Sequence, residues 1–385
     1  MSKGAYLGVD GIARKVRKIY VGVDGVAKKV KKGYIGVNGI AHKFFGGELR
    51  YYGTTTLSKP RCGLGGVANK EYALFVGGRT APSDAETCQA LIDAYSKTLT
   101  RTSIEAPWVA KTNMATTGVG QYAVIAGGLN HSDYDYYVDA YDETLTDVRA
   151  DNITTGRAQL AGATVGGYAV FAGGERKYGN VYSNVDAYSE TLVKSKPTSL
   201  SAGRTSLAGA TIGNYCVFAG GLTSYSQAAS TVDTYDTSLT RTIATSLSQS
   251  RGHLAGGTVG NYAVFAGGKN IRNDTYKTNY YNTVETYDKS LTKGIASVLK
   301  SARCGIACMA VEDWIIFAGG NTYNTTTTVV DVYDASLTKV SINNLSTARQ
   351  QFSAASIGNY ALFGGGVTSA LDDSSLGTID VYTVD

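Results

Sequence analysis

Short apolar segments alternate with polar turns along residues 48–385, and many of these segments end in a pair of glycines. The stretch RGHLAGGTVGNYAVFAGG (251–268) shows the repeated unit: a small-residue segment, a Gly-Asn turn and an aromatic–aliphatic segment. A variable loop, a VDAYD-like segment and a TLT or SLT turn follow in the typical copy. Short apolar segments bounded by turn residues predict β-strands, so each copy predicts a small antiparallel sheet.

Seven copies of this unit follow one another at spacings of 46 to 52 residues. Their glycine pairs begin at Gly77, Gly127, Gly173, Gly220, Gly267, Gly319 and Gly365. An all-β repeat of this length predicts a β-propeller with one four-stranded blade per copy. The chain ends on a third strand (379–385), and residues 49–57 align with segments that leave an outer strand. We therefore expect a seven-bladed β-propeller over residues 46–385, with the N-terminal strand completing the last blade.

Residues 1–45 form a separate module with a period of 14, as in YVGVDGVAKKVKKG (20–33). The central Asp-Gly or Asn-Gly of each unit predicts a type I′ turn and a β-hairpin. This module holds ten Lys and Arg against two Asp, whereas the rest of the chain holds 26 bases and 29 acids. Isolated hairpins are marginal in water, so we expect this module to stack or to dock on a partner. Nucleic acid is a less favoured partner, because no base-stacking pattern accompanies the lysines.

Composition excludes several classes of protein. Hydrophobic residues make up 43% of the chain, and there are 47 Gly and 28 Tyr but only 4 Pro, which suits many short strands rather than a disordered chain. No run of about 18 apolar residues could span a membrane, and the first residues lack the apolar run of a signal peptide. Five cysteines without a CxxC pair predict free thiols rather than a disulfide framework or a zinc site.

One base and one acid recur in all seven copies. The bases lie eleven residues before the aromatic residue of the second strand, at Arg61, Lys111, Arg157, Arg204, Arg251, Arg303 and Arg349. The acids lie two residues before the tyrosine of the third strand, at Asp93, Asp139, Asp186, Asp233, Glu285, Asp331 and Asp380. The bases could form a cationic collar that holds a carboxylate or an acidic sugar. Sevenfold recurrence instead favours structural pairs, because a binding site needs asymmetry.

The variable loops after the glycine pairs combine tyrosine with Asn, Ser, Thr and Asp, a chemistry typical of recognition surfaces. We expect ligand-binding residues among the tyrosines of these loops, which are Tyr134, Tyr136, Tyr137, Tyr178, Tyr182, Tyr225, Tyr276, Tyr280, Tyr281 and Tyr323. The alternative is that these tyrosines only pack against neighbouring loops. A scaffold of repeats places function in what varies between the copies.

Catalysis has little support in the sequence. The three histidines lie in a hairpin, a loop and an inner strand, and no HExxH, GxSxG or P-loop motif is present. We therefore predict no catalytic residue, no metal site and no cofactor. A glycosidase-like carboxylate pair would converge only in three dimensions, so a sugar-processing epimerase or hydrolase remains the alternative.

The double glycine with a downstream tyrosine strand resembles kelch repeats over residues 48–385, although the tryptophan of kelch outer strands is missing. The basic 14-residue units resemble the GVDGVA-KKVKK-type repeats of virion proteins from phages and prophages of Gram-positive bacteria. This resemblance implies a virion component, such as a tail, baseplate or capsid accessory protein, made in the bacterial cytoplasm. Residues 1–45 would anchor it to other particle subunits, and its loops would bind a host-surface glycan or protein. An intracellular kelch-like interaction module is a further alternative.

Overall fold

A computed structural model describes residues 47–385 except 107, 109, 132, 225–226, 272–277, 324 and 370–373. Within residues 1–46 it describes the backbone of six strands, paired as three hairpins: β1 (Tyr6–Val9) with β2 (Ile12–Lys15), β3 (Tyr20–Val23) with β4 (Val26–Lys29), and β5 (Gly33–Val37) with β6 (Ile40–Phe45). The Asp-Gly and Asn-Gly turns expected between these strands lie outside the described residues.

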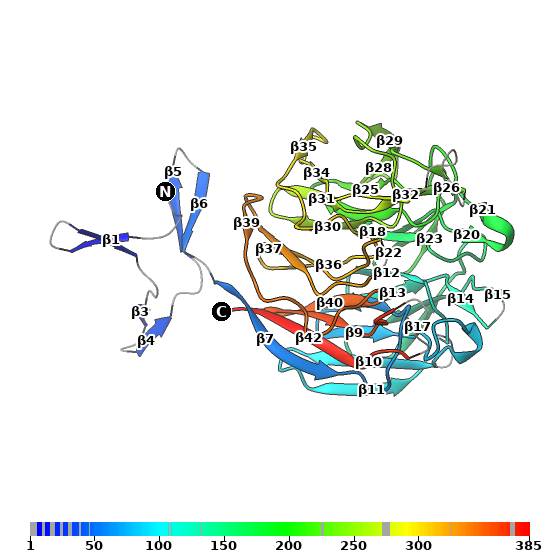
Figure 1. Cartoon of the computed structure of the whole chain (residues 1–385), viewed down its shortest axis with the longest axis horizontal. Coiled ribbons are helices and arrows are strands. Elements are labelled where there is room, and N and C mark those ends of the chain that lie inside the picture. The colour runs from blue at the N-terminus through cyan, green and yellow to red at the C-terminus, as the bar shows by residue number, and fades with distance from the viewer. Residues whose placement is uncertain are drawn as a thin grey trace.

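Seven four-stranded antiparallel sheets form a ring, so the expected seven-bladed β-propeller is confirmed (Figure 1). In order from blade 1 to blade 7, the innermost strands are β8 (Gly65–Ala68), β12 (Ala115–Val119), β18 (Ala161–Val165), β24 (Ala208–Ile212), β30 (Ala255–Val259), β36 (Ala307–Val311) and β40 (Ser353–Ile357). The second strands are β9 (Tyr72–Val76), β13 (Tyr122–Ala126), β19 (Tyr168–Ala172), β25 (Tyr215–Ala219), β31 (Tyr262–Ala266), β37 (Trp314–Ala318) and β41 (Tyr360–Gly364).

The third and outer strands complete each blade. The third strands are β10 (Leu91–Ser96), β16 (Val138–Tyr141), β22 (Val185–Ser189), β28 (Val232–Asp236), β34 (Val284–Tyr287), β38 (Val330–Asp334) and β42 (Thr378–Val384). The outer strands are β11 (Arg101–Glu105), β17 (Asp147–Ala150), β23 (Lys194–Ser195), β29 (Arg241–Ala244), β35 (Lys293–Ile295), β39 (Lys339–Val340) and, in blade 7, β7 (Leu49–Thr56).

The antiparallel order sorts the connections onto two faces. We call the loop face the one that carries the loops between second and third strands and the connections between blades, and the turn face the one that carries the tight turns. Several loops fold into small hairpins, which are β14 (Leu129–Asn130) with β15 (Asp133–Tyr134), β20 (Glu175–Arg176) with β21 (Asn180–Val181), β26 (Leu222–Ser224) with β27 (Gln227–Ala228), and β32 (Lys269–Ile271) with β33 (Thr278–Tyr280). Two short 3₁₀ helices, η1 (Ala85–Thr87) and η3 (Lys177–Gly179), also lie in these loops.

The core lies between blades. The second strand is buried in every blade, and its residues pack on the second and third strands of the neighbouring blade, as Val124 of blade 2 shares a cluster with Phe171 and Tyr188 of blade 3. Near the ring axis the innermost strands approach so closely that a Cβ on Gly209 would lie 2.4 Å from the carbonyl oxygen of Gly162. The glycines of these strands therefore permit the blades to converge.

The turns between third and outer strands hold a leucine in a left-handed conformation in six blades, with φ between 60° and 63° at Leu99, Leu145, Leu192, Leu239, Leu291 and Leu337. This conformation costs a non-glycine residue about 1–2 kcal/mol. Each leucine packs against an interblade cluster, Leu192 buried and the other five partly buried, and burial of a leucine side chain contributes up to about 1.5–3 kcal/mol. Burial therefore offsets the backbone strain.

The two ends of the propeller sequence meet in blade 7. Strand β7 pairs antiparallel with β42 from Leu49↔Val384 to Thr56↔Thr378, interrupted by one register shift beside Gly53. The Arg50 guanidinium donates to both carboxylate oxygens of Asp385, at 2.6 and 2.9 Å. This pairing covers the outer edge of β42, so blade 7 has four strands like the other blades.

Deletion of residues 46–57 is expected to lower the thermal unfolding midpoint by at least about 10 °C, because it removes β7 and exposes the edge of β42. Removal of residues 1–45, which leaves β7 in place, is the matched control and should leave the midpoint within about 2 °C. Differential scanning calorimetry measures both. An unchanged midpoint after deletion of 46–57 would contradict this closure.

Candidate functional site

Every blade contains one buried ion pair between the recurrent base and the recurrent acid. Nitrogen–oxygen distances of 2.8–3.0 Å join Arg61–Asp93, Lys111–Asp139, Arg157–Asp186, Arg251–Glu285, Arg303–Asp331 and Arg349–Asp380, and Arg204 contacts Asp233 in the same way. All fourteen side chains are buried. Base and acid belong to the same blade, and the base lies in the connection that enters that blade.

The main chain of each base binds the preceding blade. The second glycine of each pair donates its N–H to the carbonyl of the next blade's base, as Gly174 does to Arg204 at 2.8 Å. A Cβ on the first glycine, Gly173, would lie 2.4 Å from that carbonyl oxygen, and its φ is +69°. The glycine pair is therefore required by the incoming base, and the base joins two blades through its backbone and its side chain.

A second cation also approaches the acid in six blades, which we did not anticipate from the sequence. It lies on the outer strand, 2.6–3.9 Å from the carboxylate, at Arg101, Arg149, Lys194, Arg241, Lys293 and Lys339. In blade 7 the Tyr51 hydroxyl donates to Asp380 instead, at 2.9 Å, and burial is the main reason that its pKa rises to about 12. The signal was available, because this cation follows the acid by eight residues in five blades.

Blade 2 departs from this arrangement. Its base is Lys111, which lies 3.0 Å from Asp139 and 3.1 Å from a second buried carboxylate, Asp135. Burial is the main reason that the pKa of Asp139 is raised, and Asp135 adds to the rise against the opposing charge of Lys111. In blade 3, burial alone would raise the pKa of Asp186, but Arg157 and its other partners lower it.

The connection into blade 2 differs as well. In six blades, the residue three positions before the base donates its backbone N–H to the acid at 2.8–3.2 Å, from Ser58, Thr154, Ser201, Ser248, Lys300 and Ser346. Trp108 occupies this position in blade 2, and half of its surface is exposed. Within the described residues, Oδ1 of Asp139 has no hydrogen-bond donor.

Trp108 belongs to an aromatic cluster on the loop face, which we call the blade 2 cluster: Trp108, Tyr136, Tyr137 and Arg149. The Arg149 guanidinium carbon lies 3.8 Å from the centre of the Trp108 ring and 4.6 Å from that of Tyr137. Tyr136 packs against Tyr137 with ring centroids 4.6 Å apart and is 44% exposed. The cluster thus combines two exposed rings with a cation held between aromatic faces.

The unusual buried charges fix the backbone of this cluster. Asp135 accepts the N–H of Tyr137 at 2.9 Å, and Lys111 Nζ donates to the Tyr137 carbonyl at 3.4 Å. The N–H of Ile153 donates to the carbonyl of Tyr136 at 2.9 Å. The bonds from Ile153 and Lys111 have counterparts in other blades, as Leu200 donates to Ser183 and Arg204 to Thr231. Asp135 is the group that blade 2 adds to this common scaffold.

The other tyrosines expected to bind a ligand do not join this cluster. Tyr134, Tyr182, Tyr280 and Tyr281 are half-buried in their own loops, and burial raises the pKa of Tyr280. Tyr323 is 72% exposed on blade 6. Tyr225, Tyr276 and the side chain of Tyr178 lie outside the described residues.

Two titratable groups lie near the ring axis on the loop face. Burial raises the pKa of Glu175, which accepts a hydrogen bond from Gln159 at 2.6 Å. Burial also lowers the pKa of His253 to about 4, so its imidazole is neutral at neutral pH. Ser206 connects the two neighbourhoods, because its hydroxyl donates to Gln159 and its carbonyl accepts the N–H of His253. These bonds form a polar network rather than a direct acid–base pair.

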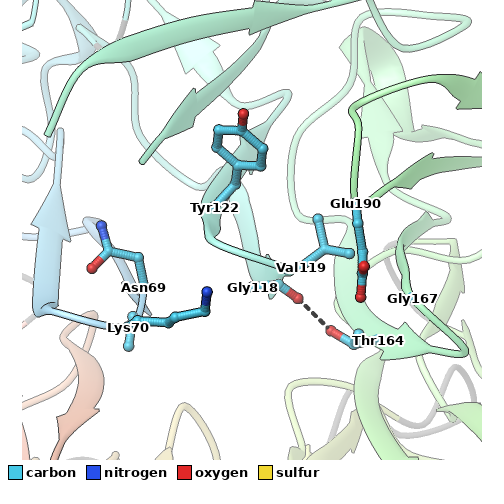
Figure 2. Close-up of a pocket in the computed structure, with 10 residues that line it drawn as sticks. Asn69, Lys70, Gly118, Val119, Tyr122, Thr164, Gly167 and Glu190 are labelled. Carbon is cyan, nitrogen blue, oxygen red and sulfur yellow. Dashed lines mark hydrogen bonds between the residues drawn. The ribbon is translucent and has the colours of Figure 1, made fainter. Parts of the chain in front are cut away.

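A shallow pocket of about 350 Å³ opens on the turn face (Figure 2). Lys70 and Glu190 lie on its opposite walls, with Tyr122 at one end. Lys70 is largely exposed and pairs with Glu143 at 2.8 Å, which is an ordinary surface ion pair. Thr164 donates to the Gly118 carbonyl at 2.8 Å and thereby joins two innermost strands. The lining residues serve the scaffold.

Further features bear on chemistry and location. All five cysteines are free thiols. In the part of the chain that the structure describes, no three His, Cys, Asp or Glu side chains are grouped to hold a metal ion. The described residues also contain no helix long and apolar enough to cross a membrane.

Comparison with known proteins supports the fold alone. No family model and no curated protein matches the sequence of this chain. The solved structure of YjhT is similar, with a TM-score of 0.58 and 12% sequence identity, over 74% of this chain and 98% of that chain. At this identity the similarity shows a shared propeller architecture.

Replacement of Arg157 by Met is expected to destabilise the protein by about 3–5 kcal/mol, because it leaves the buried Asp186 without its main partner. Lys194→Met is the matched control: Lys194 contacts the same carboxylate but is partly exposed, and its loss should cost about 1 kcal/mol or less. Urea unfolding followed by tryptophan fluorescence measures both. Equal losses would contradict the assignment of the inner base as the structural partner.

The pH dependence should differ between blades 2 and 3. The pKa of Asp186 is lowered in the folded state, so its ionisation stabilises the fold above its unfolded pKa, and this contribution disappears as the pH falls through the folded pKa. Asp186→Asn should therefore cost more at pH 7 than at pH 3. The pKa of Asp139 is raised, so its ionisation opposes folding and Asp139→Asn should cost least at pH 7. Unfolding free energies at both pH values test this contrast, and parallel behaviour would contradict it.

Proposed function

We propose that this chain is a non-enzymatic recognition protein of a phage or prophage particle, in which residues 1–45 anchor a kelch-like propeller that presents its loop face to a host-surface glycan or protein. The observation that carries the recognition role is the blade 2 cluster. It exposes Trp108 and Tyr136 on one face, where six of seven blades place a small polar or lysine residue at the position of Trp108.

Asymmetry supports this choice of site. Thirteen of the fourteen buried charges follow one arrangement of arginine and carboxylate, and the exception, Lys111, lies directly beneath the cluster. A scaffold contact recurs in every blade, whereas a binding site departs from the repeat. Recognition surfaces combine exposed aromatic anchors with adaptable polar groups, as the Tyr136 and Tyr137 loop does.

The anchoring role rests on the resemblance of the basic 14-residue units to virion repeats and on their separate charge. The paired backbone of β1 to β6 supplies three short hairpins, and a two-stranded hairpin gains stability by docking. We place this contact with other subunits of the particle. Tail, baseplate and capsid accessory positions all fit this role.

A propeller that lacks residues 1–45 should be soluble and absent from purified particles, because its anchor is removed. Particles assembled with the full-length and the shortened chain, compared by immunoblot after density-gradient purification, measure the incorporation. Equal incorporation of the shortened chain would refute the anchoring role.

Trp108→Ala should reduce binding of the isolated full-length protein to host cells or to their extracted surface glycans by at least about tenfold, because the exposed anchor of the cluster is lost. Ile295→Ala, which truncates an exposed hydrophobic residue on blade 5, is the matched control and should have no effect. Surface plasmon resonance measures both. Enzymatic turnover of any of these extracted glycans would favour the sugar-processing alternative instead.

A further inference from the structure

We propose that the blade 2 cluster binds an acidic sugar, with Arg149 holding its carboxylate and the exposed aromatic rings holding its ring. This inference rests on the proposed recognition function and names the ligand class of that face.

The hydrogen bonds of Arg149 separate it from the other outer-strand cations. Arg241, Lys293, Lys339 and Lys194 each donate to a backbone carbonyl of the connection that enters their blade, and Arg101 donates to the carbonyl of Thr56, at the end of β7 just before that connection. Arg149 has no hydrogen-bond acceptor among the described residues, and its nearest charge is Asp139, whose Oδ1 lies 3.7 Å from Nε. A guanidinium carries five N–H donors, so several are left for a ligand.

The position of Arg149 suits a carboxylate. Trp108 and Tyr137 lie over the guanidinium at 3.8 and 4.6 Å, and the side chain remains 39% exposed. Because Asp139 is nearest to Nε, the terminal nitrogens are available for a bidentate bond with an incoming carboxylate. The aromatic faces restrict the rotation of the side chain and reduce the entropy lost on binding.

The aromatic residues of the cluster favour a carboxylate that is carried on a sugar ring over other anionic ligands. Trp108, which packs on the guanidinium, is 50% exposed, and Tyr136, which packs on Tyr137, is 44% exposed. The C–H face of a pyranose packs on such rings, and tyrosine hydroxyls can bond to its hydroxyl groups. Lys111 and Asp135 hold the tyrosine loop in place before the ligand arrives. A cation that packs on one exposed ring, with a second exposed ring in the same cluster, therefore complements a ring that carries a carboxylate, as in a uronic acid.

The test uses the full-length protein with a glucuronic-acid-containing tetrasaccharide and the same tetrasaccharide with its carboxyl groups reduced to alcohols, by isothermal titration calorimetry. The acidic form should bind about 10- to 100-fold more tightly, as expected for a charged hydrogen-bonded pair. Arg149→Gln should abolish this preference, and Trp108→Ala should weaken both forms. Arg241→Gln is the matched control, because Arg241 is the equivalent cation of blade 4 and lies 3.7 Å from Asp233, and it should change neither affinity.

Several outcomes would overturn the inference. Equal affinity for the acidic and reduced forms, or an unchanged preference in Arg149→Gln, would remove the role of the carboxylate. Binding of polyglutamate as tight as that of the uronate, with the same dependence on Trp108, would assign the site to an acidic protein. Binding to host cells that depends on Trp108, without binding of the uronate, would overturn the sugar class and leave the recognition function standing. Melting temperatures of all variants verify that they fold.

Discussion

The ring depends on the pairing of a buried base with a buried acid at the entrance to each blade. An unpaired charge in such a place costs several kcal/mol, so the connection can enter the blade only where the carboxylate receives it. The same residue offers its carbonyl to the glycine pair of the blade before, as Arg204 does to Gly174. One residue thus fixes the side-chain contact within its blade and the backbone contact between blades. The glycine pairs, the third-strand acids and the interblade distance all follow from this junction.

A junction that recurs in every blade leaves little of itself available for function. Its charges are buried and its hydrogen bonds are used internally, as the contacts of Arg157 with Asp186 and with the Gly173 carbonyl show. Residues that differ between blades are free of this requirement. In blade 2 the change from arginine to Lys111 accompanies a second carboxylate, Asp135, which accepts the N–H of Tyr137 in the loop. The scaffold chemistry is there adapted to support an exposed surface.

Much of the fold could be predicted from the sequence, because its determinants repeat. The glycine pairs, the small inner strands and the spacing of bases and acids each occur seven times, and their alignment predicted the blade number and the fourteen charged residues. The left-handed backbone of Leu99 and its counterparts could not be anticipated, since leucine rarely adopts it and only interblade burial maintains it. The candidate site was predicted in part. Tyr136 and Tyr137 were named with eight other tyrosines, and nothing in loop composition distinguishes a tyrosine at the surface from one half-buried like Tyr182.

Trp108 and Arg149 were missed for a different reason: each is visible only as a departure from a register. Trp108 stands where the other connections have a backbone donor to the acid, and Arg149 follows its acid by ten residues rather than eight. The two departures belong together. A bulky ring replaces the small polar residue or lysine of the other connections, and the outer cation, which binds a backbone carbonyl in five other blades, lies against that ring. Among the described residues, this exchange gives up a hydrogen bond within the scaffold and leaves the guanidinium donors without an acceptor, beside exposed aromatic surface. Such an arrangement gains most when a ligand supplies the missing acceptor, which is why recognition chemistry belongs in blade 2 rather than in the shallow pocket of the turn face.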